Sequence, residues 1–285
     1  LERLFSMNKL WTKNFTIVTV GSLISLLGNA VSNFTLGLVV YNETNSTLLY
    51  SLFLILNTLP KIIVPMLVGP FVDRTSRKNI IVNVDTIYGF LFALLTYISF
   101  IGYFNYTFFI LFSITLGILD SVYNVAYESF YPEFISKGNF SKAYSISSLM
   151  YPIANTIMVP IAGFTYEHVG VTYLFLFISI TFFVTQAIER LIDADEENLK
   201  KRAKKDIEKK STYWSDFKEG ISYLKNEAGL TAITAYFFIS LLTSASLQTL
   251  MLPYFTALGM ITQYSFLMSL QTFGRVVGGV LHYKF

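Results

Sequence analysis

The sequence contains no cysteine and only two histidines, His168 and His282. Without cysteine the chain can form no disulfide framework and no thiolate metal site, and two isolated histidines leave little for a histidine-based metal or catalytic centre. Charged residues are also scarce, at 14% of the chain, whereas a water-soluble domain usually has about 25%. These shortages argue against a soluble enzyme and predict neither a cofactor nor a metal.

Apolar residues take the place of the missing charge. They make up 53% of the chain, aromatic residues make up 17%, and the mean hydropathy is +0.54. About 20 apolar residues cross the hydrocarbon core of a bilayer. Windows of this kind, bounded by polar or turn residues, lie at 15–40, 48–71, 79–103, 106–131, 143–166, 171–191, 229–254 and 262–284. The predicted fold class is therefore an all-α polytopic membrane protein with eight helices.

The distribution of Lys and Arg predicts the orientation of these helices. With a cytoplasmic N-terminus, every Lys and Arg except Lys61 and Arg275 falls before the first window or in a segment on the same side. The segments predicted to be external, at 41–47, about 104, 167–170 and 255–261, contain none. This bias is the one that the positive-inside rule describes.

A long polar segment divides the chain. Residues 190–212 have mixed charge and no apolar periodicity, which is typical of a solvated linker, and an amphipathic helix follows with Trp214, Phe217, Ile221 and Leu224 on one face. We therefore predict an N-terminal segment at 1–14, a six-helix bundle at 15–192, a linker with a surface helix at 193–228, and two helices of a second bundle at 229–285.

An internal repeat supports this division. Residues 50–71 align without gaps to residues 264–285, with identical residues at six positions and Lys61 opposite Arg275. An offset of six helices keeps the same membrane direction, so this is a parallel repeat of whole halves, as some transporters have. Apolar composition raises the number of chance matches, so the repeat is support for two bundles and no proof of them.

The loop GPFVDRTSRK lies between the second and third predicted helices. It resembles the signature of the major facilitator superfamily of transporters, G-x-x-x-D-R-x-G-R-K, at the same place. The matching residues are Gly69, Asp73, Arg74, Arg77 and Lys78. Ser76 stands where the family has its inner glycine.

Other features are most similar to the drug-efflux branch of this family, which includes macrolide and siderophore exporters. They are the linker, the surface helix and the segment PEFISKGNFSKAYS. Two further family signatures are only partly matched. Ser113 and Leu116 replace an arginine and a glutamine in the fourth helix, and the antiporter pattern of the fifth helix keeps only Pro160 and Gly163. The resemblance implies twelve helices, so we expect a fragment that ends after eight, with Met7 as its natural start.

The charged loop suits a gate. Asp85 follows Lys78 by seven residues, which places it two turns deeper on nearly the same helix face. An ion-pair network of these residues with Asp73, Arg74 and Arg77 that forms in one conformer and breaks in the other would bias a two-state equilibrium. The alternative is that the cations are ordinary anchors at the membrane edge.

Three charges are predicted to lie deep in the membrane. Lys61 is about 18 to 20 Å from either surface at 1.5 Å per residue, and an ionised lysine there costs about 3 kcal/mol unless it faces a cavity or a partner. Asp120 is about as deep, and Arg275 matches Lys61 in the repeat. These residues could form a central pathway for proton coupling, with Asp120 or Asp85 carrying the proton. Alternatively, Lys61 and Asp120 form a constitutive pair that locks two helices together.

Polar residues at helical spacing predict a water-filled cavity. Ser25, Asn29 and Ser32 mark one face of the first helix, and Asp120, Asn124, Tyr127 and Tyr131 mark one face of the fourth. Membrane helices also use such residues to bind one another, so each stripe has a purely structural alternative.

Together these observations predict an integral protein of the bacterial plasma membrane that exports a small amphipathic solute or drug by alternating access, as a proton-coupled antiporter. Its predicted partners are a small-molecule substrate, protons and the lipid bilayer, with no nucleic acid. Two alternatives remain, namely a nutrient-uptake permease of the same fold and a non-transporting scaffold or inactive truncated product. No paired acids, histidine cluster or activated nucleophile favours a membrane-embedded enzyme.

Overall fold

The computed structural model describes residues 9–193, 222 and 227–284, and every regular element within these ranges is helical. The elements are α2 (Lys13–Thr44), α3 (Thr47–Arg74), α4 (Arg77–Phe100), α5 (Tyr106–Phe130), the 3-10 turn η1 (Tyr131–Phe134), α6 (Phe140–His168), α7 (Val171–Glu189), α10 (Ala228–Ala257) and α11 (Ile261–Lys284). The predicted all-α class is confirmed. The linker and the amphipathic helix around Trp214 lie outside the described residues.

Each of the eight predicted windows coincides with one of these helices. Seven of the described helices are long and apolar enough to cross a membrane, and they are α2 to α7 and α10. The eighth window forms α11, which is 24 residues long and carries more polar residues, such as Gln263, Gln271 and Arg275. The structure therefore agrees with a multi-pass membrane protein.

Short polar side chains begin four of the helices. Thr12, Ser46, Ser76 and Asn105 each accept a hydrogen bond from a backbone N–H in the first turn of the helix that follows. The cap at Ser76 is notable, because its hydroxyl accepts from the backbone N–H of Asn79 at 3.1 Å. Serine at the position of the family's inner glycine thus starts α4 directly, and a cap of this kind stabilises a helix by about 1 kcal/mol.

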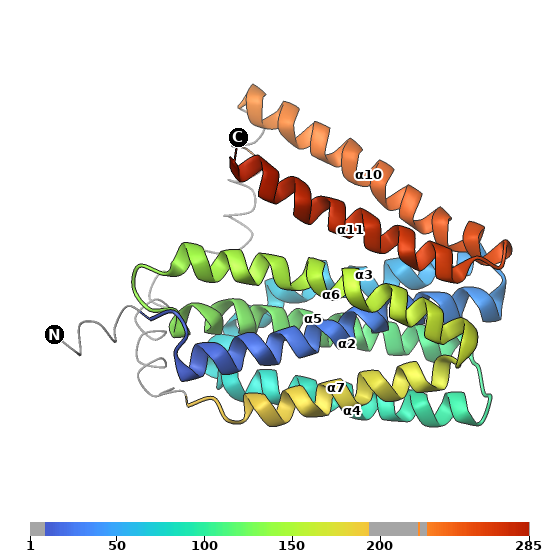
Figure 1. The fold of residues 1–285 in the computed structure, drawn as a ribbon, viewed down its shortest axis with the longest axis horizontal. Helices are drawn as coiled ribbons and strands as arrows, with labels where there is room; N and C mark the ends of the chain where they lie inside the picture. Colours follow the sequence, from blue (N-terminus) through green and yellow to red (C-terminus); the bar gives the residue numbers. More distant parts are fainter. Residues whose placement is uncertain (1–8, 194–221, 223–226, 285) are drawn as a thin grey trace. The chain divides into compact units, whose positions relative to one another are not determined.

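The described residues belong to two compact units. The first contains α2 to α7 together with α11, and the second contains α10 up to Tyr254. Within the first unit α4 packs along α7, α3 along α5, α2 against both α6 and α7, and α11 along α6 (Figure 1). This arrangement is a bundle in which helices far apart in sequence are direct neighbours.

Glycines allow these helices to approach closely. A Cβ atom at Gly28 of α2 would lie 2.5 Å from the Thr181 hydroxyl of α7, and one at Gly89 of α4 would lie 2.9 Å from the Phe183 ring. At Gly117 of α5 it would collide with the backbone carbonyl of Asn57 in α3. Small residues at helix crossings are characteristic of membrane bundles, because they let the backbones come together.

The bundle buries a set of polar side chains within a mostly apolar core and exposes many large apolar side chains on its surface. Buried positions include Ser25, Ser32, Ser113, Ser121, Ser179 and Thr185. On α4, by contrast, Phe90, Leu94, Tyr97 and Phe100 are exposed. A water-soluble protein rarely shows so much apolar surface, whereas a lipid-facing surface requires it.

A carboxylate of α6 caps the start of α11. Glu167 Oε1 accepts hydrogen bonds from the backbone N–H groups of Ile261 at 2.9 Å and Thr262 at 3.1 Å, and its Oε2 accepts from the Thr262 hydroxyl. Farther along the same pair of helices, a Cβ at Gly163 would collide with Ser265, and Ser269 donates to the carbonyl of Thr156 at 2.5 Å. Helix α11 is therefore held to α6 at several levels.

Candidate functional site

A cavity of about 710 Å³ lies inside the bundle, between α2, α3, α4, α5 and α6. Its wall is mostly polar and aromatic, which is unusual for the interior of an apolar bundle. The wall includes Ser25, Asn29 and Ser32 from α2, Asp120, Asn124 and Tyr127 from α5, and Tyr131. The structure thus brings both predicted polar stripes to one cavity, on facing helices.

Lys61 and Asp120 meet in this cavity. Lys61 Nζ lies 3.0 Å from Asp120 Oδ2, and the two side chains retain 35% and 26% of their accessible surface. Each residue sits near the middle of its helix, with Lys61 about 20 Å from both ends of α3 at 1.5 Å per residue. An ion pair at this depth that still reaches open space is exposed to whatever enters the cavity.

Close contact between α3 and α5 makes this pair possible. Gly117 lies about one turn before Asp120 and touches the backbone of α3, and Ser121 donates to the carbonyl of Pro60 at 3.2 Å. Asn57, one turn before Lys61, donates its amide to the carbonyl of Ser113 at 3.1 Å. The two helices are fixed to each other on both sides of the pair, so its geometry is set by the backbone.

Tyrosines form a row along one side of the cavity. The rings of Tyr123 and Tyr127 stack at 5.9 Å, those of Tyr127 and Tyr131 stack at 5.3 Å, and Tyr144 meets Tyr131 edge-on at 5.9 Å. All four residues line the cavity. The polar stripe predicted from helical spacing contains Tyr127 and Tyr131. Tyr123 lies one turn before Tyr127 on α5 and outside that stripe, and Tyr144 comes from α6 and could not be found from the pattern of one helix.

Several lining residues were not predicted. Asn33, Asn57 and Glu128 also face the cavity. Asn33 directly follows Ser32, and Glu128 follows Tyr127, so they widen the predicted stripes by one position. Asn57 is one turn before Lys61 on α3, and that spacing was the signal available in the sequence.

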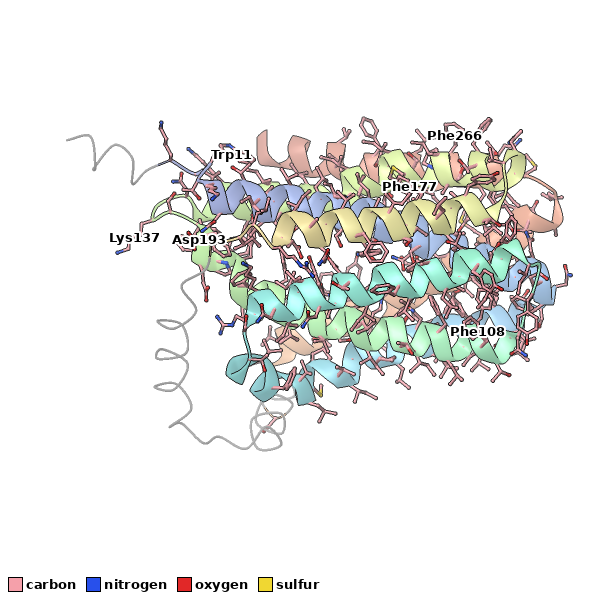
Figure 2. All side chains as sticks on the ribbon, turned by 90° about the horizontal axis from the view of Figure 1, so that it is seen from below. Trp11, Phe108, Lys137, Phe177, Asp193 and Phe266 are labelled. Carbon is pink, nitrogen blue, oxygen red and sulfur yellow. The ribbon has the colours of Figure 1, made fainter. Side chains whose placement is uncertain are left out.

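The charged loop lies at one end of the bundle, which we call the basic end. Arg77 Nη1 donates to Glu133 Oε1 at 2.6 Å and to the carbonyl of Ser129 at 3.3 Å, and Lys78 Nζ donates to the carbonyl of Ile192 at 2.5 Å. Figure 2 places Trp11, Lys137 and Asp193 at one common end of the bundle and Phe108 at the opposite end. The start of α2, the loop before α6 and the end of α7 therefore meet at a single end, as the predicted topology requires.

Asp85 lies in a different setting from the ion-pair network that we expected. It is 1% exposed, and its side chain lies beside that of Glu189 on α7, which is 2% exposed. Among the residues that the structure describes, neither carboxyl pairs with a cation. Glu189 was missed because it ends its helix beside Arg190, where an acid reads as an interfacial residue.

The remaining predicted residues are less informative here. Gly69 lies in the last turns of α3, and the side chains of Asp73 and Arg74 lie outside the described residues. Arg275 is exposed on α11 and is absent from the described lining of the cavity. The structure therefore joins Lys61 to Asp120 and leaves Arg275 apart from them.

Comparison with known proteins identifies this architecture. The sequence profile of the Major Facilitator Superfamily matches residues 18–285, which include all the described helices except the first turns of α2. The chain belongs to the Major Facilitator Superfamily. Members of this superfamily are membrane transporters and not enzymes. The match extends over the charged loop, the cavity helices and both helices after the linker.

A relative in the superfamily is similar over most of this chain. It is the uncharacterized MFS-type transporter YkuC of Bacillus subtilis strain 168, which is 25% identical over 230 residues. That alignment covers 80% of this chain and 53% of the relative, so the chain spans about half the length of the curated relative that it matches. No solved structure matches the chain.

Proposed function

We propose that the protein is a secondary active transporter that exports a small amphipathic solute or drug by alternating access, in exchange for protons. One observation carries the proposal. A cavity of about 710 Å³ in the middle of an apolar bundle contains a partly exposed ion pair, Lys61 with Asp120. Ionised side chains inside a membrane are costly, and they mark substrate or ion pathways.

The shape and chemistry of the wall suggest the substrate class. The row of four tyrosines offers flat apolar faces with hydroxyl groups at their edges, and the serines and asparagines of α2 offer donors and acceptors opposite. Such a wall suits a solute with an aromatic or apolar body and a few polar groups. The volume is within the range of small-molecule sites.

The loop at the basic end suits the gate. With the N-terminus in the cytoplasm of a bacterial cell, Gly69, Asp73, Arg74, Arg77 and Lys78 lie at the cytoplasmic edge. The contacts of Arg77 with Glu133 and of Lys78 with Ile192 hold α4, α5 and α7 together in this conformer, and their rearrangement would accompany a second conformer. Arg275 is exposed here, so it would join the pathway only in another conformer.

Transport by cells that express the complete protein tests the proposal. Intracellular accumulation of a panel of amphipathic dyes and drugs is measured with and without a proton uncoupler, beside cells with an empty vector. We expect lower accumulation that the uncoupler reverses, loss of this effect in Lys61→Ala, and its retention in Lys137→Ala, a cation removed at the exposed basic end. Raised accumulation would indicate uptake, and equal accumulation in all cells would contradict transport.

A further inference from the structure

We propose that the carboxyl pair Asp85–Glu189 is a proton-binding site of the transporter, connected to the substrate cavity through Tyr123. The inference deepens the proposed function, because it names where the exchanged proton binds. It concerns two residues outside the lining of the cavity, one of which no sequence pattern had singled out.

The pair is sealed from water. Asp85 on α4 and Glu189 on α7 retain 1% and 2% of their accessible surface, and Asp85 Oδ2 and Glu189 Oε2 have no hydrogen-bond partner in the described structure. Close packing causes this burial. Gly21 of α2 lets Glu189 approach, since a Cβ there would lie 3.2 Å from Glu189 Cγ, and Gly89 lets α4 and α7 meet one turn from Asp85.

A hydrogen bond between two carboxyl groups requires a proton. An ionised carboxylate has only acceptor atoms, so two of them cannot form a hydrogen bond with each other, whereas a protonated carboxyl group can donate to a carboxylate. The side chains of Asp85 and Glu189 lie beside each other, and each has a buried oxygen atom without a hydrogen-bond partner among the described residues. We therefore infer that at least one of them carries a proton, as in other sites where two buried carboxyl groups meet.

Tyr123 links this pair to the cavity. Its hydroxyl donates to Glu189 Oε1 at 3.3 Å, and its side chain is part of the cavity wall. A hydroxyl is both a donor and an acceptor, so it can pass a proton from the cavity to the carboxylate by exchanging its own. In that transfer the carboxylate gains the tyrosine proton and the tyrosine regains one from a hydronium ion in the cavity, which leaves a neutral water and an unchanged Tyr123.

Within the described part of the chain, the other ionisable groups around the pair do not offset its charge. Helix α4 contributes Tyr88, whose hydroxyl donates to the carbonyl of Leu116 at 3.0 Å, and α5 contributes Tyr123 and Tyr127, with Asp120 beyond Tyr88. The ionisable residues of α2 are at its ends, namely Lys13, Tyr41 and Glu43. Lys78 lies toward the rim and donates to Ile192, and Arg190 is exposed.

This setting distinguishes the pair from Asp120. Asp120 is neutralised by Lys61, so a proton bound there would break an ion pair. Among the described residues Asp85 and Glu189 have no cation as a partner, and loss of their proton would leave two negative charges side by side in a medium of low dielectric. Such a pair retains its proton while it is buried and releases it when water enters, which is the behaviour that alternating access needs.

Infrared difference spectroscopy on the purified complete protein tests the protonation directly and needs no substrate. We expect a band of a protonated carboxylic acid at neutral pH that shifts in D₂O, is lost in the double variant Asp85→Asn with Glu189→Gln, and persists in Asp120→Asn. Absence of the band from the unaltered protein, or its persistence in the double variant, would overturn the proposal. Absence of the band from the unaltered protein overturns the proposal even if the variants do not fold.

Transport in proteoliposomes tests the coupling. One proton exchanged per substrate supports about tenfold accumulation per unit of pH gradient. We expect Glu189→Gln to lower the ratio of gradient-driven accumulation to substrate exchange by about this factor. We expect Tyr123→Phe to slow accumulation without changing its final level. If Glu189→Gln left the ratio unchanged, the pair would have a structural role only. If the unaltered protein neither exchanges nor accumulates substrate, the proposed function is contradicted. The infrared measurement still tests the protonation of Asp85 and Glu189, because it does not depend on transport.

Discussion

The bundle contains two pairs of ionisable side chains that differ in almost every respect. Lys61 and Asp120 are opposite in sign, partly exposed and open to the cavity, whereas Asp85 and Glu189 have the same sign and are almost fully buried. The first pair is stable as two charges because each compensates the other. The second is stable only if it is not fully charged. The depth of an acidic side chain in the membrane therefore does not by itself determine its charge state. Its partner and its access to water determine it.

The way in which the helices cross beside each pair produces this difference. At Gly117 the helices α3 and α5 touch, and beyond it they border the cavity, so Lys61 and Asp120 face open space. At Gly89 and Gly21 the helices α4, α7 and α2 close over the acids from two directions. The predictions below alter one pair or the crossing beside it and use the other as the reference.

Exchange of the two charges in the cavity has the largest expected effect. In Lys61→Asp with Asp120→Lys the ion pair can re-form, so we expect the protein to reach the membrane in normal amounts, but transport to fall at least about tenfold because each charge now lies on the wrong wall. The single variant Lys61→Asp places two acids together and should reduce the amount of protein as well. Transport restored by the exchange would show that the pair only fastens α3 to α5.

Crowding at the helix crossings has the next largest effect. Gly117→Val and Gly89→Val each insert atoms where a single Cβ already collides, and overpacking costs about 1 to 3 kcal/mol. Thermal unfolding in detergent measures the loss. A matched control is Gly274→Ala on α11, where a Cβ has open space within 4 Å, and this change should be neutral or slightly stabilising. Equal melting temperatures in all three variants would contradict the described packing.

Neutral isosteres of the buried acids should change stability much less. Glu189→Gln keeps the size of the side chain and a donor toward Asp85, so we expect a change in unfolding free energy of about 1 kcal/mol or less. Glu189→Ala, by contrast, leaves a cavity and an unsatisfied carboxyl, and should cost about 2 kcal/mol or more. If Gln were as destabilising as Ala, the pair would need its negative charge for stability.

Removal of the N-cap of α4 has the smallest expected effect on stability. Ser76→Ala removes the acceptor for the backbone N–H of Asn79 and should cost about 1 kcal/mol, whereas Ser76→Gly, which restores the family's residue, should cost only a few tenths. Asp85 lies more than two turns beyond Ser76 along α4, so the infrared band of the buried acids should not change. A change in that band would show that the loop and the pair are coupled.

Much of the fold follows from the sequence because the bilayer imposes a simple rule. Each span must be apolar over about 20 residues, and helix α5, predicted at 106–131, is observed at Tyr106–Phe130. The stripe of Ser25, Asn29 and Ser32 likewise follows from helical spacing, because lipid cannot satisfy such residues and they must turn inward.

Contacts between helices were harder to predict. Nothing local in the sequence around Glu189 indicates that Asp85, more than 100 residues earlier, is its neighbour, because α4 and α7 meet through tertiary packing alone. The repeat places Arg275 opposite Lys61, but an equivalent position in a second half does not create an equivalent environment, and Arg275 is exposed. The depth of a charged residue in the membrane could be predicted by counting residues along its helix. Its partner could not, because the partner depends on which helix faces pack together.

The cap that Glu167 forms on α11 has a consequence for how the protein is made. The first turn of α11 takes its acceptor from α6, a helix that the ribosome completes much earlier in the chain. When α11 is synthesised, the Glu167 carboxylate is already present to accept hydrogen bonds from its first N–H groups. That contact sets the position of the start of α11 along α6 and its rotation about its own axis. An early helix thereby acts as a template for a late one.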